Sequence, residues 1–372
     1  MRSIAILNQR PDRPPSNCGF SAGFAGRNPG SAAAISVAYR VRECRILATG
    51  HGHVCAADVK PIRSEFRVPR RSLVAVLAVT AFAVTACGSD PSEPSTSTPA
   101  TISPPAVADL SNTLMEIQER HDVLFGIAAY SPTGARTFEW NATDRFALTS
   151  TFKVYAVAAL LRLAERGEVD LNEQVPILRS DIVIASPTTS YRAGETLSWY
   201  DLCQATLVRN DNTAANLILR RIGGPPAVTA LARTLGDTQT RLDRWEPALN
   251  EALPGDTRDT STPAAFAGGL HRLVLGNALI PEHRRMLTGW MRSSVTSGER
   301  MREGLPVGWV AADKSGTGAY GTVNDAGVVW SPTGTSVVLV IFSRSTIGYP
   351  MAAPSDQAIA DATTAVLETV TS

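Results

Sequence analysis

The sequence predicts an α+β fold, an α/β sandwich in which one antiparallel sheet, built from both termini of a folded domain, is covered by helices and lies beside an all-helical lobe. Three observations lead to this prediction. Strand patterns occur near the start of the domain and near its end, helical patterns fill the middle, and residues 107–372 contain no second linker. A stretch of 266 residues is long enough for one large domain or two interleaved lobes.

The first elements of the domain alternate between helix and strand. An amphipathic helix is expected at its start, because four apolar residues follow helical spacing: Val107, Leu110, Leu114 and Ile117. Residues 123–130 are typical of a strand, 131–135 of a turn, and 137–140 of a returning strand. A helix is then expected over residues 153–166, ended by Gly167.

Helical patterns dominate the middle of the domain, and strand patterns return near its end. The helical patterns fall at residues 200–208, 214–222 and 263–275. The late strand patterns fall at residues 309–313, 326–330 and 336–343, and a last helix is expected over 356–369. Strands from both ends with helices between them favour a single sheet built from the termini.

The charges are balanced overall but unevenly distributed. The chain of 372 residues has 35 Lys and Arg against 34 Asp and Glu, yet residues 1–86 have a net charge of +8 and residues 87–372 of −7. An acidic domain lacks the basic surface that binds polyphosphate, so no nucleic-acid partner is expected. The five cysteines form no C-x-x-C pair and the five histidines no H-E-x-x-H motif, so no metal, cofactor or disulfide scaffold is expected.

Residues 68–86 have the features of an export signal peptide. Basic residues precede an unbroken run of 14 apolar or small residues, Leu73–Ala86, which is shorter than the about 20 residues of a bilayer-spanning helix. A buried core helix is the alternative, although the run has no charged face or cap. The run ends at Cys87, and Val84-Thr85-Ala86-Cys87 resembles the lipobox of bacterial lipoproteins, whose cysteine is lipidated. This resemblance implies an exported protein of the cell envelope, held to the membrane only through a lipid anchor on Cys87, or a periplasmic or extracellular one.

Two further segments flank the signal. Because export signals begin at the N-terminus, residues 1–67 are expected to be an over-extended translation start or a disordered extension. Residues 87–106 are rich in Pro, Ser and Thr, which favours an extended, solvated spacer. The folded domain is therefore expected to span residues 107–372.

A serine and a lysine three residues apart form the first candidate site. Ser150 and Lys153 lie at the expected start of a helix, where this spacing places the amine and the hydroxyl on one face. A serine hydroxyl becomes a nucleophile when a nearby base takes its proton and helix amides provide a favourable field. Alone, the S-x-x-K pattern is weak, because a serine cap followed by a solvated lysine explains it as well.

Three later stretches strengthen the interpretation: Asn210-Asp211-Asn212, Glu246-Pro247-Ala248-Leu249-Asn250 and Lys314-Ser315-Gly316. In this order S-x-x-K, an (S)DN element, E-x-x-L-N and K-[ST]-G resemble the signature of class A serine β-lactamases. The resemblance covers residues 107–372, and both lysines of this region fall on motif positions. The sequence is similar to the actinobacterial, lipoprotein type of this family.

The resemblance implies a hydrolase that opens β-lactam antibiotics through a serine acyl-enzyme, and it assigns the catalytic roles. Ser150 corresponds to the nucleophile and Lys153 to a proton acceptor or relay. Glu246, as general base, and Asn250 would hold the water that hydrolyses the ester. The backbone amides of Ser150 and Thr317 would form the oxyanion hole, which stabilises charge that develops in the reaction.

The resemblance also assigns the residues that bind the substrate. Lys314, Ser315 and Thr317 correspond to residues at the substrate carboxylate. Arg300 resembles an arginine that actinobacterial relatives use for the same group, and a surface charge is the alternative. Asn212 corresponds to a contact with the amide side chain of the substrate; bracing of its loop is the alternative, and both roles can coexist.

Asn210 departs from the family pattern, which has a serine at this position. In relatives that hydroxyl passes a proton to the departing lactam nitrogen, whereas an amide donates hydrogen bonds but relays protons poorly. General acid help is worth ~10²–10⁴-fold in rate, so impaired acylation is expected unless Lys153 or a water substitutes. Ala185 falls where many relatives carry an aromatic residue at the cleft rim, which implies a more open entrance.

Two ion pairs and one thiol are also expected from the resemblance. Arg244 with Asp259 resembles the pair that closes the family's omega loop, and Arg241 with Asp256 is expected to form a second pair. Cys203 matches a cysteine that some relatives oxidise, but the partner's position holds a valine here, so a buried free thiol is expected.

Two other functions stay open from the sequence alone. A penicillin-binding peptidase shares the Ser/Lys chemistry, although Glu246 with Asn250 argues for hydrolysis of the acyl-enzyme. The second is a degenerate β-lactamase fold that binds β-lactam or cell-wall ligands without turnover. Asn210 is the feature that supports this alternative. A β-lactam small molecule is the expected partner, and the protein is expected to be a monomer.

Overall fold

The computed structural model describes residues 45–49, 52–56, 102–132 and 136–372. The chain divides into two units, residues 1–91 and 92–372. In the first unit, β1 (Arg45–Thr49) and β2 (Gly52–Ala56) pair as a two-stranded antiparallel sheet.

Several predictions lie outside the described residues. They are the export signal over 68–86, the lipidation site Cys87, most of the extension 1–67, the spacer before residue 102, and residues 133–135 of the expected turn. None of the helices that the structure describes combines the length and apolar character needed to cross a membrane.

A five-stranded antiparallel sheet with the order β4-β3-β11-β10-β9 forms the middle of the second unit. Its strands are β3 (Val123–Tyr130), β4 (Thr137–Trp140), β9 (Val310–Gly318), β10 (Thr322–Trp330) and β11 (Ser336–Ser345). β3 pairs with β11, so that Ile127 lies opposite Ile341. This register confirms the predicted sheet built from both ends of the domain.

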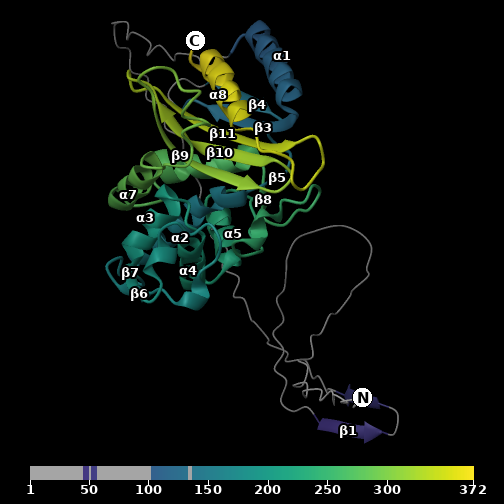
Figure 1. Cartoon of the computed structure of the whole chain (residues 1–372), viewed down its shortest axis with the longest axis vertical. Coiled ribbons are helices and arrows are strands. Elements are labelled where there is room, and N and C mark those ends of the chain that lie inside the picture. Colours follow the sequence, from purple (N-terminus) through teal and green to yellow (C-terminus); the bar gives the residue numbers. More distant parts are fainter. Residues whose placement is uncertain (1–44, 50–51, 57–101, 133–135) are drawn as a thin grey trace, which may run out of the picture. The chain divides into compact units, whose positions relative to one another are not determined.

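Two helices from the two ends of the domain cover one face of the sheet (Figure 1). α1 (Pro104–His121) and α8 (Asp356–Thr371) pack on each other and on β3. Each begins with a serine cap, since Ser103 Oγ accepts from the amide of Ala106 and Ser355 Oγ from the amide of Ala358. Apolar side chains of both helices and the sheet form one core: Leu110, Leu114, Phe125, Ile127, Ile341, Ile359 and Val366.

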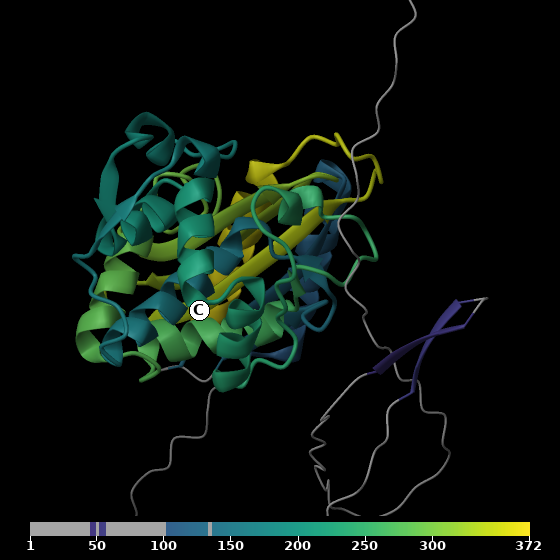
Figure 2. The same ribbon diagram turned by 90° about the horizontal axis from the view of Figure 1, so that it is seen from below.

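α6 (Pro263–Leu270) and a helical lobe cover the opposite face (Figure 1). The helices of this lobe are α2 (Lys153–Glu165), α3 (Trp199–Val208), α4 (Asn212–Ile222), α5 (Pro225–Thr234) and α7 (Pro281–Arg292). Figure 2 looks onto this side, with the helices of the lobe in front of the strands. The predicted α+β fold, with a sheet beside an all-helical lobe, is confirmed.

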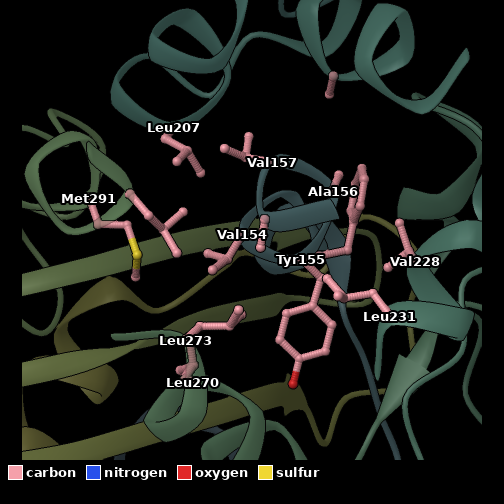
Figure 3. Packing of buried hydrophobic residues seen from close by; sticks show 14 of the residues in the cluster. Val154, Tyr155, Ala156, Val157, Leu207, Val228, Leu231, Leu270, Leu273 and Met291 are labelled. Atoms are coloured by element: carbon pink, nitrogen blue, oxygen red, sulfur yellow. The ribbon is translucent and has the colours of Figure 1, made fainter. Parts of the chain in front are cut away.

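α2 is the central helix of the lobe, and most of its residues are fully buried. Figure 3 shows its residues 154–157 among apolar side chains from α3, α5, α6 and α7. The Tyr155 ring stacks on Phe266 with ring centroids 4.8 Å apart, and its hydroxyl donates to Asp237 Oδ2 at 3.2 Å. Because a close-packed helix cannot shift without repacking its neighbours, α2 is a rigid support for its first residue, Lys153.

Two short antiparallel ribbons complete the unit. β5 (Phe146–Ala147) pairs with β8 (Thr260–Ser261), and β6 (Gln174–Pro176) pairs with β7 (Thr196–Ser198). The first ribbon matters for function, because β5 leads directly into the turn that carries Ser150.

The structure differs from the predicted elements in three places. The strand predicted over 309–313 continues to Gly318, because its polar and glycine residues pair with β10. The helix predicted over 263–275 is α-helical to Leu270 and ends in a π-helical turn. Helices α5 and α7 have no counterpart among the predictions; both begin with proline, which suits a first helical position but is easily taken for a break.

Candidate active site

Ser150 lies in a 3₁₀ turn, Thr149–Phe152, between β5 and the start of α2. Thr149 has a φ of 46°. Such a conformation costs a non-glycine residue about 1–2 kcal/mol and persists only where surrounding contacts hold it. The hydroxyls of Thr149 and Thr151 both donate to Leu148 O, at 2.7 and 2.6 Å. The turn is therefore held in place, and it presents Ser150 with only 3% of its surface exposed.

Lys153 is fully buried, and its ammonium is surrounded by oxygen atoms. Nζ donates to Asn210 O and Asn210 Oδ1 at 2.8 Å and to Asn212 Oδ1 at 2.6 Å, and it lies 3.3 Å from Glu246 Oε1. Burial lowers the pKa of Lys153, while the Glu246 carboxylate opposes part of this effect. A lysine with a lowered pKa accepts a proton at neutral pH more readily than an ordinary lysine.

The Glu246 carboxylate contacts both the serine and the lysine. Its Oε1 accepts from Ser150 Oγ at 3.3 Å, and its Oε2 accepts from Asn250 Nδ2 at 2.5 Å. Asn216 of α4 fixes the backbone here, since it accepts from Glu246 N at 3.0 Å and donates to Glu246 O at 2.9 Å. Groups up to 96 positions apart in the chain therefore meet around one carboxylate.

Asp211 holds the loop between α3 and α4. It is fully buried and caps α4, because its Oδ1 accepts from Ala214 N at 2.8 Å. Its Oδ2 accepts from the amides of Thr188 and Thr189, both at 2.9 Å. One aspartate thus fixes both this loop and the loop around residue 188.

The asparagines on either side of Asp211 both direct an oxygen toward Lys153. Asn210 has a φ of 58°, and its amide oxygen is engaged by the lysine. Asn212 also braces the neighbouring loop, because its Nδ2 donates to Ile184 O at 3.0 Å. The predicted bracing role of Asn212 is therefore confirmed.

β9 approaches the serine turn closely at Gly316. A Cβ atom at this position would lie 2.1 Å from Thr149 Oγ1 and 3.0 Å from Ser150 N. Only glycine permits this approach without a shift of strand or turn. As a result Thr317, the next residue of β9, lines the same cleft as Ser150.

Lys314 is the second fully buried lysine of the site, and its Nζ donates to Ser315 O at 2.7 Å. Burial, and after it repulsion from Lys153, holds the pKa of Lys314 well below its usual value. The Ser315 hydroxyl shares a hydrogen bond of 2.7 Å with the hydroxyl of Thr296.

Arg300 is buried beside β9, so its alternative interpretation as a surface charge is wrong. Its Nη2 donates to Thr317 Oγ1 at 2.7 Å and its Nη1 to Gly316 O at 3.0 Å, while its Nε lies 2.8 Å from Asp356 Oδ1. The guanidinium thus supplies positive charge next to the Thr317 hydroxyl.

An ion pair closes the segment that carries Glu246. Arg244 Nε lies 2.5 Å from Asp259 Oδ2, as predicted. Asp259 Oδ1 also accepts from the amides of Asp243 and Arg244, at 2.7 and 2.9 Å. The buried Asp259 therefore ties both backbone and side chain at the start of the segment.

The predicted pair between Arg241 and Asp256 is wrong. Arg241 Nη2 instead lies 2.5 Å from Asp243 Oδ1, and Asp256 Oδ2 lies 2.6 Å from Arg258 Nη2. Each partner is two positions away in sequence, so these local pairs order less of the chain than a pair across the segment. Hydrogen bonds from Arg258 lower the pKa of Asp256 to about 2.

These elements enclose a cleft of about 540 Å³, within the range of about 300–1,000 Å³ usual for small-molecule sites. Its walls are formed by ten residues: Ser150, Ile184, Ala185, Asn210, Asn212, Pro247, Ala248, Asn250, Glu251 and Thr317. Ala185 lines this cleft and has a φ of 56°. None of the ten residues is aromatic.

The structure brings most predicted site residues together. Ser150, Lys153, Glu246, Asn250, Asn210 and Asn212 form one connected set of contacts, and Thr317 faces the same cleft. Cys203 lies apart as the expected buried free thiol, and burial raises its pKa. Among the described residues, no group of three His, Cys, Asp or Glu side chains is arranged to hold a metal.

Two supporting residues were not predicted, Asn216 and Thr296. Asn216 follows Asn212 by four positions and so lies one helical turn along α4, a spacing that could have indicated a shared role. Thr296 belongs to no motif, and it is 19 positions from Ser315 in the sequence. Only the folded structure brings their hydroxyls together, so no local sequence pattern identifies Thr296.

Most of the second unit is similar to proteins named β-lactamases. The profile of the "Beta-lactamase enzyme family" matches residues 109–370. A β-lactamase of Streptomyces fradiae is 40% identical over 313 residues, which cover 83% of this chain and 99% of that protein. A β-lactamase of Mycobacterium tuberculosis is 40% identical over 301 residues, which cover 80% of this chain and 96% of that protein.

Solved structures agree with these sequence similarities. A β-lactamase from Desulfarculus baarsii has a TM-score of 0.68 at 41% identity, over 70% of this chain and 97% of that chain. A class A β-lactamase representing the last common ancestor of Gram-negative bacteria has a TM-score of 0.67 at 39% identity, over 70% of this chain and 98% of that chain.

Proposed function

This chain belongs to the β-lactamase enzyme family and has the class A fold, and on that premise we propose that it hydrolyses β-lactams with Ser150 as the nucleophile. The observation that carries the proposal is the position of Glu246, because Ser150 Oγ and Lys153 Nζ each lie 3.3 Å from its Oε1. A base is thus within reach both when the serine attacks and when its ester is hydrolysed.

In the first step Ser150 Oγ attacks the β-lactam carbonyl carbon and the ring C–N bond breaks. The departing ring nitrogen takes a proton from Lys153 or a water, and an ester on Ser150 remains. The serine proton passes to Glu246 or, through the shared contact, to Lys153, whose lowered pKa suits an acceptor. The backbone amides of Ser150 and Thr317 stabilise the oxyanion. The close approach of β9 to the Ser150 amide at Gly316 supports this role.

In the second step water hydrolyses the ester. Glu246 takes a proton from a water held between its carboxylate and the Asn250 amide, and the water oxygen attacks the ester carbonyl. The bond from the carbonyl carbon to Ser150 Oγ then breaks, and Glu246, whose Oε1 lies 3.3 Å from this oxygen, returns the proton to it. The 2.5 Å hydrogen bond from Asn250 Nδ2 to Glu246 Oε2 supports this pairing.

Substrate binding uses the positive charge around β9. Lys314, Ser315 and Thr317 bind the substrate carboxylate, with Arg300 supporting the Thr317 hydroxyl. Asn212, whose side chain lines the cleft, contacts the amide side chain of the substrate. The buried guanidinium of Arg300 favours this assignment, because a charge shielded from water attracts an anion more strongly. A bound carboxylate also favours the protonated form of Lys314, against the effect of burial on its pKa.

The proposal includes slow acylation because Asn210 replaces the serine of the family pattern. Lys153 engages the Asn210 amide oxygen, and an amide does not relay a proton to the leaving nitrogen. Asn210→Ser is expected to raise the acylation rate by at least about tenfold, toward the ~10²–10⁴-fold of general acid catalysis. Stopped-flow measurement with a chromogenic cephalosporin tests this, with Asn210→Ala as the control that should restore nothing. An unchanged rate in Asn210→Ser contradicts the idea.

Mass spectrometry after mixing with a penicillin separates the alternatives. Transient acylation of Ser150 with release of product supports a β-lactamase, and Glu246→Gln should then accumulate the acyl-enzyme. Persistent acylation in the wild-type protein indicates a penicillin-binding peptidase or a trap, and no adduct indicates a ligand-binding fold. Ser150→Ala is the control that should form no adduct.

For the segments before the domain we propose that residues 68–86 direct export and that Cys87 carries the lipid, with 87–106 as the spacer and 107–372 as a monomeric catalytic domain. The support is the sequence pattern described above. Radiolabelled fatty acid should be incorporated by the wild-type protein in a bacterial host but not by Cys87→Ala, which should be recovered unanchored.

A further inference from the structure

Asn324 of β10 is fully buried and contacts the chain that leads into the nucleophile's turn. Its Nδ2 donates to Ala147 O at 2.7 Å, to Leu148 O at 3.1 Å and to Thr149 Oγ1 at 3.2 Å. Its Oδ1 accepts from Ser343 N of β11 at 3.2 Å. One side chain therefore joins this turn to two strands of the sheet.

The backbone of Asn324 is tied to the other wall of the site. Asn324 lies opposite Gly316 in the pairing of β10 with β9. Its carbonyl accepts from Arg300 Nη1 at 3.3 Å, and the same nitrogen donates to Gly316 O at 3.0 Å. Asn324, which holds the serine turn, is thus linked through Arg300 to Gly316, the residue that precedes Thr317.

The turn needs such support because of its conformation. Thr149 has a φ of 46°, and a residue in this region stays there only when contacts on several sides over-determine it. The hydroxyls of Thr149 and Thr151 bond Leu148 O from within the turn, whereas Asn324 bonds it from the sheet. The amide of Asn324 therefore fixes where the turn sits relative to the strands.

We infer that Asn324 is a positioning residue for Ser150, whose amide and hydroxyl it holds at the correct distance from Thr317 of β9. This inference rests on the proposed function. Both tetrahedral intermediates place their oxyanion between the Ser150 and Thr317 amides, so acylation and deacylation should slow together. A displacement of about 1 Å at a reacting group can cost about 10²-fold in rate. The dissociation constant of the substrate depends on Lys314 and Asn212 instead and should change little.

Three variants of Asn324 test the inference in the full-length protein. Asn324→Asp keeps the shape but turns an oxygen toward Ala147 O and Leu148 O, and Asn324→Ala deletes the contacts. Each is expected to lower the single-turnover acylation and deacylation rate constants by roughly 10²-fold, with less than about threefold change in the substrate dissociation constant. Asn324→Ser keeps one donor and should recover part of the loss.

Ser343→Ala is the matched control. The Ser343 hydroxyl is buried in the same sheet and donates to Val323 O at 2.6 Å, so its removal costs one buried hydrogen bond, whereas Asn324→Ala loses the four contacts of the amide. Ser343→Ala should lose less thermal stability than Asn324→Ala and keep both rate constants within about twofold. If the two variants lose rate in the same proportion to their loss of thermal stability, the role of Asn324 is only structural and the inference is overturned.

Amide hydrogen exchange separates this inference from the proposed function. If the wild-type protein forms no adduct with a β-lactam, the proposed function fails, and exchange over residues 146–152 still reports on Asn324. Exchange in this segment should be faster in Asn324→Ala than in both wild type and Ser343→Ala. Unchanged exchange in Asn324→Ala would falsify the positioning role, whatever the activity.

Discussion

Lys153 and Lys314 are the two lysines between residues 102 and 372, and both lie in the candidate active site with no exposed surface. Elsewhere in the domain the chain uses arginine, which keeps its charge at any physiological pH. A buried lysine can lose its charge, and burial lowers the pKa of both residues. Lys153 can therefore act as a proton acceptor where the proposed acylation needs one, because it lies 3.3 Å from the Glu246 carboxylate oxygen that accepts from Ser150.

We predict that Lys314→Met stabilises the fold near neutral pH while weakening catalysis. Burial holds the pKa of Lys314 well below its usual value, so at pH values between the folded and unfolded pKa values the unfolded chain binds more protons at this residue than the folded chain does. Wild-type stability therefore falls as the pH drops below about 10.4, the usual lysine pKa. Methionine removes this penalty, with an expected gain of about 1–4 kcal/mol in the free energy of unfolding.

Urea unfolding at several pH values checks this prediction. The stability difference between Lys314→Met and wild type should grow as the pH falls from about 10 to about 7, since the protonation penalty grows over that range. Lys153→Met is the comparison variant, because it leaves the buried Glu246 carboxylate without its cation and should gain less. A gain that is independent of pH would contradict the explanation.

At the scale of elements, the site depends on how closely β9 approaches the serine turn. Gly316→Ala would place a Cβ atom 2.1 Å from Thr149 Oγ1. Strand or turn must then shift, which is expected to cost about 1–3 kcal/mol of stability and roughly 10²-fold in kcat. Steady-state kinetics and thermal unfolding measure both effects.

Gly289→Ala is the matched control for this prediction. Gly289 lies in α7, and a Cβ atom added there would have none of the surrounding atoms within 4 Å, so alanine should be neutral or stabilise the helix by about 0.5–1 kcal/mol. Wild-type kcat in Gly316→Ala would show that the close approach is not needed for catalysis.

The sequence predicted the elements whose pattern is local, and it missed those that depend on contacts. The strand over 123–130 follows from its apolar run, whereas the polar residues 314–318 become strand only by pairing with β10. The catalytic stretches were recognised from residue types and order. Asn324 belongs to no such stretch, because its role depends on which carbonyl groups the fold brings to it.

At the scale of the whole molecule, the candidate active site lies where the sheet meets the helical lobe. Two apolar cores, one on each face of the sheet, hold these layers, and the site takes residues from both. Lys153 belongs to α2 of the lobe, while Lys314 and Thr317 belong to β9 of the sheet. Loosening of either layer should therefore reduce activity before the protein unfolds completely.

Removal of residues 1–91 should leave catalysis unchanged. The contacts described for the site lie between residues 146 and 356, within the second unit. The shortened protein is expected to keep kcat/KM within about twofold of the full chain and to unfold at nearly the same temperature, because it keeps all the contacts described for the site. A tenfold loss of kcat/KM would show that the first unit contributes to the site.

The pairing of β3 with β11 also determines when the protein can finish folding. Tyr130 of β3 pairs with Val338 of β11, so β3 finds this neighbour only after the ribosome has added about 200 more residues. Contacts between such distant segments slow the search for the native state. The nascent chain consequently stays incomplete until its last strands emerge, and a stop codon before residue 336 should yield a product that proteases degrade rapidly.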